Sequence, residues 1–267
     1  MDQNRQSRLE IRNLTLQYPG KMLCRNLNLT IRPGECWAIL GQNGAGKTTL
    51  MHALGGLSQM KPGGSSDVAL GGKSTRDWPR RELARNIGIL LQEEPGEFWG
   101  DVHEYVLLGR HPYAGHSFGW QATDHAIADC AIARLDLANL ANRSFITLSG
   151  GERQRARLAL LLAQSPQFYL LDEPLQHLDL RHQLTAMKLF AELARRGDAL
   201  VMVLHDIGWV SQFCDHVLML FDDGHLLAGN TQELLNRHNL EALYQCDIME
   251  LAAGRLRHFV PATMPSV

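Results

Sequence analysis

Residues 36–57 have the sequence CWAILGQNGAGKTTLMHALGGL, and this stretch decides the fold. Residues 36–40 form a short continuous apolar run, which is typical of a strand buried on both faces. A glycine-rich loop follows, and residues 48–57 have the apolar spacing of a helix. The loop fits the pattern G-x-x-x-x-G-K-[ST]. We therefore expect a buried strand, a phosphate-binding loop and a helix in direct succession.

Each residue type in the loop suits the binding of phosphate. Glycines let successive backbone N–H groups point at phosphate oxygens, and the start of the next helix adds a positive dipole end. We expect Lys47 to reach the β- and γ-phosphates of a nucleotide, and the Thr48 hydroxyl to bind Mg²⁺. The alternative is a glycine-rich turn with a solvated lysine, but the flanking strand and helix favour the nucleotide site. Its predicted residues are Gly41, Gln42, Asn43, Gly44, Ala45, Gly46, Lys47, Thr48 and Thr49.

Buried runs alternate with helical patterns over much of the remaining chain. Helical spacing occurs at Leu180, Leu184, Met187, Ala191 and Ala194. Buried strands alternating with helices predict a parallel sheet that is covered on both faces. The further short apolar runs lie at 87–91, 168–171, 199–204 and 217–221.

The beginning of the chain and its middle have different patterns of apolar and polar residues. Residues 9–18 and 27–31 alternate apolar and polar side chains around a Pro19-Gly20 turn, which predicts an antiparallel, half-exposed layer. Residues 101–163 predict helices with glycine and proline breaks, and the last ~40 residues predict a small strand at 226–228 followed by helices. We expect one α/β domain, whose parts are a core with the antiparallel layer (1–94 and 165–245), an inserted helical subdomain (95–164) and a C-terminal tail (246–267).

Composition narrows the functional classes. The 267 residues are 45% hydrophobic and 20% charged, which is ordinary for a globular protein. Lys plus Arg is 26 and Asp plus Glu is 28, so a broad basic face for nucleic acid is not expected. No apolar run approaches the ~20 residues of a membrane span, and the polar start predicts no signal peptide. The five cysteines lack C-x-x-C spacing, so we expect reduced thiols and no structural metal site.

Two carboxylates follow the apolar run at 168–171. Ligands of open α/β sheets bind at the carboxyl ends of the strands, which is where Asp172 and Glu173 stand. Asp172 would hold Mg²⁺, and Glu173 would polarise an attacking water as general base. A solvated turn before Pro174 is the alternative, which the phosphate-binding loop makes less favourable.

The segment 148–155, LSGGERQR, resembles the signature motif of the ATP-binding cassette (ABC) ATPases. Ser149 and Glu152 also form a plain capping-box pattern. Helix starts bind anions, so the cap and a phosphate site are compatible. In this family the signature motif faces the γ-phosphate of ATP held by another subunit, which assigns Ser149, Gly150 and Gly151 to the partner's nucleotide.

Further motifs match the family in order, over residues ~8 to ~245. The resemblance implies that Tyr18 stacks on adenine, that Gln92 touches Mg²⁺ and water, that Asp179 crosses a dimer interface and that His205 bonds the γ-phosphate. Taken alone, Tyr18 would be interpreted as a residue that packs within a strand layer. His205 alone would be interpreted as a structural histidine at the end of a strand. The resemblance gives Glu173, His205, Gln92 and Lys47 catalytic roles, and gives Thr48, Gln92 and Asp172 the Mg²⁺. It implies the P-loop NTPase fold of ABC proteins.

The chain departs from the family pattern at two places. Gln42 replaces the usual proline, and its side chain is expected to point away from the phosphates. Leu175, followed by Gln176 and His177, replaces the common threonine after Pro174 and is expected to tune the interface without removing a ligand. Residues 105–112, YVLLGRHP, resemble the segment that follows the glutamine loop in importers of ferric siderophores, haem and cobalamin.

The resemblance implies an ATP-hydrolysing, Mg²⁺-dependent importer subunit, and we take a ferric siderophore as the cargo, with haem or cobalamin as alternatives. The implied partners are two copies of a multi-span permease docked on 93–112, a second copy of this chain, and indirectly a periplasmic or lipoprotein binding protein. The resemblance also implies a peripheral protein on the cytoplasmic face of the inner membrane. No nucleic-acid partner is expected. The competing hypotheses are a soluble ABC ATPase that acts on DNA or ribosomes, an exporter subunit and a small-molecule phosphotransferase.

Overall fold

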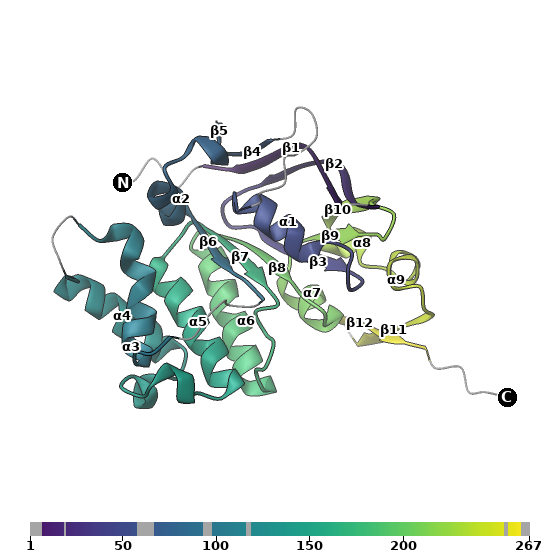
Figure 1. The fold of residues 1–267 in the computed structure, drawn as a ribbon. Helices are drawn as coiled ribbons and strands as arrows, with labels where there is room; N and C mark the ends of the chain where they lie inside the picture. Colours follow the sequence, from purple (N-terminus) through teal and green to yellow (C-terminus); the bar gives the residue numbers. More distant parts are fainter. Residues whose placement is uncertain are drawn as a thin grey trace.

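The centre of the molecule is a six-stranded sheet in the order β10-β9-β3-β8-β7-β6 (Figure 1). The computed structural model describes residues 7–18, 20–57, 67–92, 98–115, 119–253 and 256–262. All neighbouring strands of this sheet are parallel except β10, which pairs antiparallel with β9. Its strands are β3 (Cys36–Gly41), β6 (Ile87–Leu90), β7 (Phe168–Asp172), β8 (Ala199–Val203), β9 (His216–Leu220) and β10 (Leu226–Asn230).

These strands lie where the continuous apolar runs predict them. Every residue of β3, β7 and β8 is buried, because layers of side chains cover both faces of the sheet. Helices follow most of these strands in the chain, as the alternation predicts. They are α1 (Lys47–Leu54), α2 (Arg80–Asn86), α6 (Leu180–Arg195), α7 (Ile207–Phe213), α8 (Thr231–Leu234) and α9 (Arg237–Tyr244). Of these, α8 and α9 come after β10.

A second, antiparallel sheet covers one face of the central sheet. Its order is β2-β1-β4-β5, and Leu9 of β1 pairs with Ile31 of β2. The expected pair of alternating strands is confirmed, although Pro19 of the turn lies outside the described residues. The strands β4 and β5 were not predicted, because they are only four and two residues long. The bounds are β1 (Leu9–Tyr18), β2 (Lys21–Ile31), β4 (Asp67–Leu70) and β5 (Lys73–Ser74).

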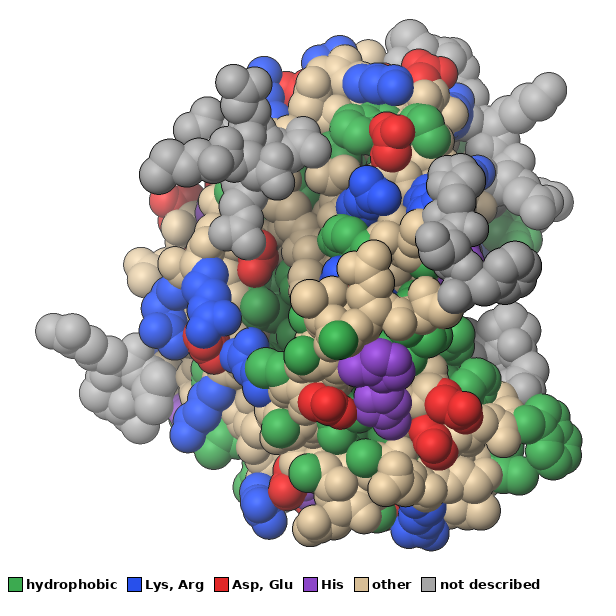
Figure 2. Space-filling view, turned by 90° about the vertical axis from the view of Figure 1, so that its left-hand side faces the viewer, with side chains coloured by type: hydrophobic (Ala, Val, Ile, Leu, Met, Phe, Trp, Pro, Cys, Tyr) green, Lys and Arg blue, Asp and Glu red, His purple; other side chains and the backbone are tan. Residues whose placement is uncertain are grey.

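Helices cover the other face of the sheet, among them α6 and α7 (Figure 1). A group of helical segments lies between β6 and β7 in the chain, as expected. Figure 2 looks onto the end of the molecule that carries α3 and α4, where acidic, basic and apolar side chains are interspersed. The expected boundary of the helical subdomain, between 94 and 95, falls in 93–97, outside the described residues. The segments are α3 (Val102–Leu107), η3 (Leu108–Tyr113), α4 (Ala122–Arg134), η4 (Ala138–Leu140), η5 (Phe145–Thr147) and α5 (Gly150–Gln164).

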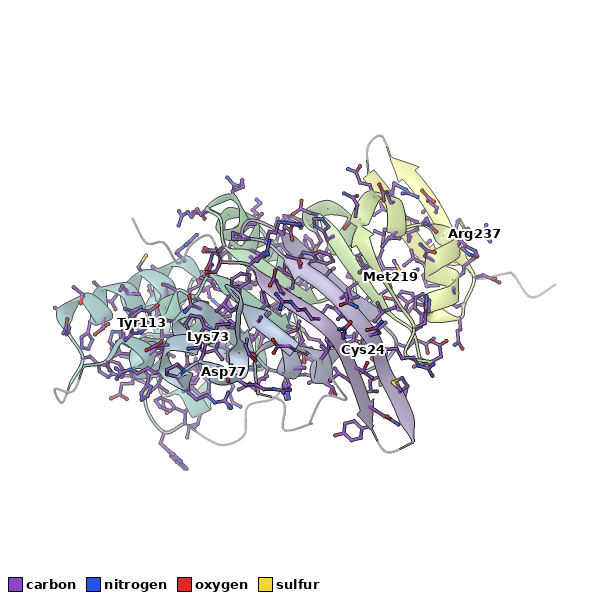
Figure 3. The ribbon with its side chains drawn as sticks, turned by 90° about the horizontal axis from the view of Figure 1, so that it is seen from above. Cys24, Lys73, Asp77, Tyr113, Met219 and Arg237 are labelled. Atoms are coloured by element: carbon purple, nitrogen blue, oxygen red, sulfur yellow. The ribbon has the colours of Figure 1, made fainter. Side chains whose placement is uncertain are left out.

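The central sheet separates two apolar cores. One core contains Cys24 of β2, Leu218 of β9 and the apolar side chains of α1, between the antiparallel layer and the sheet. The other contains Met219 of β9 and apolar side chains of the helices α3 to α7. Figure 3 shows the antiparallel layer from above, with Tyr113 of η3 and Arg237 of α9 toward opposite ends of the molecule.

Helix α6 lies where its spacing predicts a helix, but it buries a different set of side chains. Met187 is fully buried, whereas Leu180 and Leu184 are 73% and 38% exposed. The apolar side chains that α6 buries are Ala186, Met187, Leu189, Phe190 and Leu193. The first turns of α6 therefore present leucines to solvent, directly after Asp179.

The C-terminal region contains a β-hairpin where helices alone were expected. Strand β11 (Ile248–Ala253) pairs antiparallel with β12 (Leu256–Pro261). Ile248 and Phe259 are buried on one face, while Met249 and Leu251 are about half exposed on the other. Because apolar side chains occupy both faces, the period-two alternation that predicts a strand is hidden.

Candidate functional site

The loop between β3 and α1 forms a cradle of backbone groups at the carboxyl end of the sheet. Gly46 has φ +98°, and a Cβ there would lie 2.9 Å from Leu23 Cβ on β2. Only glycine combines this backbone conformation with so close an approach. Gln42 turns its side chain away from the cradle, as expected, and its Nε2 donates to the Leu243 carbonyl of α9 at 2.9 Å.

Lys47 lies folded into the cradle. Its Nζ donates to the carbonyl oxygens of Gly41 at 2.8 Å and Gln42 at 2.9 Å, and the side chain is buried. Burial lowers the pKa of Lys47, while the carboxylates of Glu173 and Asp172 oppose that shift. The cation is therefore held beside the loop by polar groups that an incoming phosphate could replace or supplement.

Asp172 ends β7 beneath the cradle and is 1% exposed. Neither of its carboxylate oxygens accepts a hydrogen bond from any residue that the structure describes. Burial raises the pKa of Asp172, and the nearby Thr48 hydroxyl opposes the rise without reaching hydrogen-bond geometry. A buried carboxylate with two unpaired oxygens beside a hydroxyl is a set of hard oxygen donors, which fits Mg²⁺.

Glu173 and His205 meet at the ends of β7 and β8. His205 Nε2 lies 2.8 Å from Glu173 Oε1. Glu173 has φ +50°, a left-handed conformation that is uncommon for a residue with a side chain. The strand ends at Asp172, and the Glu173 carboxylate lines the cleft, where the His205 imidazole contacts it.

These groups open into a cleft of about 820 Å³. Tyr18 lines it and is 54% exposed, so its ring is not buried within the strand layer. Three lining residues were not predicted as site residues, namely Lys21, Leu23 and Gln176. Lys21 Nζ donates to the Gly44 carbonyl at 3.0 Å. A lysine directly after a Pro-Gly turn carries no local pattern that would single it out. The predicted residues that line the cleft are Tyr18, Asn43, Gly44, Gly46, Lys47, Thr48, Thr49, Gln92, Glu173 and His205.

The predicted signature residues do not line this cleft. Ser149 caps α5 in a full capping box, in which its side chain accepts from the Glu152 N–H and Glu152 accepts from the Ser149 N–H. Gly151 lies against the loop after β7, because a Cβ there would be 2.8 Å from the His177 carbonyl oxygen. The start of α5 is therefore a helix N-terminus with exposed backbone donors, separate from the chain's own phosphate cradle.

The segment after Glu173 lies between the two sets of residues. Leu175 is buried in the helix-side core and does not line the cleft. Asp179 caps α6 by accepting from the His182 N–H at 2.9 Å, and its carboxylate is largely exposed. The chain thus presents a cleft, a loop with an exposed aspartate and a second helix N-terminus.

Two further predictions concern the whole chain. All five cysteines are free thiols, and the buried pair Cys36 and Cys214 lies with its sulfurs 3.8 Å apart. Among the helices that the structure describes, none has both the length and the apolar character that a bilayer crossing requires.

The sequence and structure of this chain are similar to those of known proteins. A family model described as "ABC transporter" matches residues 24–176. The hemin import ATP-binding protein of Pseudomonas aeruginosa is 37% identical over 246 residues, which are 90% of this chain and 94% of that protein. The ferric enterobactin transport ATP-binding protein of Escherichia coli is 34% identical over 249 residues, with 91% and 90% covered. A chain from an inward-facing metal-chelate type ABC transporter has a TM-score of 0.81 at 28% identity, and 96% and 98% of the two chains are covered.

Proposed function

Because this chain belongs to the ABC transporter family, whose ATP-binding subunits hydrolyse ATP to power transport, we propose that it drives the import of an iron chelate. The relatives carry hemin or ferric enterobactin by name, which supports this cargo class. We propose a ferric siderophore as the cargo, with haem or cobalamin as the alternatives. The relative that transports ferric enterobactin supports this choice.

The observation that carries the proposal is that the predicted site residues lie on two separate surfaces of the chain. Lys47, Thr48, Gln92 and Glu173 line one cleft, whereas Ser149 at the start of α5 does not line it. A helix N-terminus can bind phosphate, and a phosphate bound at the start of α5 would lie outside this cleft. We therefore propose that two copies assemble head to tail, each giving its α5 N-terminus to the ATP in the other copy's cleft.

In this assembly the chain's own residues do the chemistry by position and charge. Glu173 accepts a proton from the attacking water, and His205 orients the carboxylate and donates to the γ-phosphate. Lys47 and the loop N–H groups stabilise charge on the β- and γ-phosphates. Thr48, Asp172 and Gln92 would hold Mg²⁺, which neutralises phosphate charge when bound.

Opening and closing would follow from the phosphate that joins the two copies. The γ-phosphate contacts groups of both chains, so its loss removes the interactions that favour the closed dimer. Exposed Leu180 and Leu184, next to Asp179, add apolar surface that such a dimer could cover. We place permease docking on 93–112, of which 93–97 lie outside the described residues, and the subunit at the cytoplasmic face of the cell membrane.

The test is capture of the permease followed by an uptake assay. We expect the tagged chain, purified from mildly solubilised membranes of its own cell, to retain a multi-span permease. Reconstituted with that permease in vesicles, it should drive ATP-dependent uptake of a ferric siderophore, and haem and cobalamin are offered in parallel. Lys47→Ala is the inactive control. Co-purification with nucleic acid and no membrane protein would contradict the proposal.

A further inference from the structure

A buried glutamine on α5 contacts the catalytic loop. Gln154 is 3% exposed, and its Nε2 donates to the Pro174 carbonyl at 3.0 Å, with the Glu173 carbonyl at 3.4 Å. The neighbouring inward positions of α5 are apolar, including Ala156 and Leu158. A buried amide is favourable only when its polar atoms are paired. Gln154 therefore links α5, the helix that begins after Ser149, to the two residues that follow β7.

The other end of the same amide leads toward Gln92. Gln154 Oε1 accepts from Arg157 Nη1 at 2.9 Å, and Arg157 Nη2 donates to the Leu91 carbonyl. Leu91 directly precedes Gln92, which lines the nucleotide cleft. A continuous row of hydrogen bonds thus joins the loop of Glu173, the helix α5 and the backbone that carries Gln92.

The first turn of α5 is fixed to the same loop by close packing. A Cβ on Gly151 would lie 2.8 Å from the His177 carbonyl oxygen, and one on Gly150 would lie 3.5 Å from the His177 ring. Glu173 and His177 both have left-handed backbone conformations, at φ 50° and 64°. A shift of this loop would therefore press on the helix start that carries Ser149.

We propose that Gln154 and Arg157 are positioning residues that couple the chain's own γ-phosphate site, through Glu173 and Gln92, to its signature surface at Ser149–Gly151. The inference rests on the proposed function, in which that surface faces the ATP of a second copy. Neither residue touches ATP. Through them, the nucleotide bound in one copy's cleft alters the position of Ser149–Gly151, which face the ATP of the other copy. This is a coupling between two sites.

Gln154→Leu tests the coupling, because leucine keeps the volume and removes both hydrogen-bonding ends. ATPase rate is measured against ATP concentration, and binding of a fluorescent ATP analogue is measured separately. We expect kcat to fall about tenfold, a typical coupling size, and the Hill coefficient to fall toward 1, while analogue affinity stays within about twofold. Arg157→Met should do the same, and the double variant should be no worse than either single one, since both break one network.

Gln164→Leu is the matched control. Gln164 stands on the same helix and donates to the Ala84 and Ile87 carbonyls, which belong to α2 and β6. Its loss removes a similar pair of bonds without touching the loop of Glu173, so kcat and the Hill coefficient should stay near wild type. An equal loss in Gln164→Leu would mean general damage to α5 and would overturn the inference. Should Gln154→Leu fail to fold, Arg157→Met decides in the same way.

The two proposals fail differently. Wild-type kinetics in Gln154→Leu and Arg157→Met, beside a cooperative wild type, would overturn the coupling and leave the ATPase assignment intact. A wild type whose ATPase rate per chain is non-cooperative and independent of protein concentration would overturn the split site, and the coupling with it.

Discussion

At the scale of single residues, the site is built from groups whose charge would be costly to bury alone. Lys47 meets this cost with two main-chain carbonyls, and Asp172 stays without a hydrogen-bond partner among the described residues. A buried carboxylate whose oxygens accept no hydrogen bond is costly until a cation or further donors satisfy it. The pair is therefore arranged for a phosphate and a divalent cation, more than for the stability of the empty fold.

Lys47→Ala should weaken ATP binding by roughly ten- to a hundredfold, since a charge-assisted hydrogen bond contributes about 1.5–3 kcal/mol. Equilibrium binding of ATP by titration calorimetry measures the loss. The exposed Lys188 on α6 offers a control, and Lys188→Ala should bind ATP as the wild type does. Undiminished affinity in Lys47→Ala would argue against the cradle.

At the scale of elements, a buried arginine adds polar contacts to the apolar packing of the helices. Arg110 in η3 is 8% exposed, pairs with Asp124 of α4 at 3.0 Å and donates to the Ala163 carbonyl of α5 at 2.8 Å. Its guanidinium also lies 4.0 Å from the centre of the Tyr113 ring. One side chain therefore joins three segments of the helical region, and it lies in the stretch that resembles chelate importers.

Arg110→Met should lower the free energy of unfolding by about 3 kcal/mol, because it leaves the Asp124 carboxylate buried without its partner. Urea denaturation followed by circular dichroism measures the change. Arg181→Met is the control, since Arg181 and Asp136 form an exposed pair at 3.2 Å that should contribute less than about 1 kcal/mol. Equal losses in the two variants would refute the structural role of the buried pair.

The same pair gives a pH dependence of stability. Burial raises the pKa of Asp124, but hydrogen bonds from Arg110 and the Gln121 N–H outweigh it, so the pKa lies below its usual value. A carboxyl with a lowered folded-state pKa contributes stability above its unfolded pKa and loses it as the pH falls through the folded value. The loss from Arg110→Met should therefore be full at neutral pH and should shrink below about pH 4.

At the scale of the whole molecule, the proposed function assigns two half-sites to different surfaces of one chain. Glu173 and residues of the loop between β3 and α1 line the cleft, while the capped start of α5 and the exposed leucines of α6 do not line it. In the proposed assembly a single copy binds ATP in its cleft, and the second copy supplies the donors on the open side of the γ-phosphate. Hydrolysis should therefore depend on the meeting of two copies.

Glu173→Gln should keep ATP affinity, reduce hydrolysis at least a hundredfold and trap a dimer, since general base catalysis contributes about 10²–10⁴. Size-exclusion chromatography with light scattering, with ATP or with ADP, measures the mass. The wild-type rate per chain should rise with protein concentration. Wild-type turnover in Glu173→Gln would remove Glu173 as the base, and a strictly monomeric, fully active wild type would exclude the shared site.

The sequence by itself determined whatever depends on neighbours along the chain. The buried run at 36–40, the glycine loop and the helix after it follow from spacing within a few residues, as does the Ser149–Glu152 cap. The tertiary structure decided the contacts between segments that are distant in sequence. The bond from Gln154 to Pro174, the approach of Lys21 to Gly44, the exposed face of α6 and the hairpin β11–β12 have no local signature. The physical reason is that local periodicity reports which face of an element is apolar, whereas the partner that meets a given side chain is fixed only when the sheet order brings the elements together.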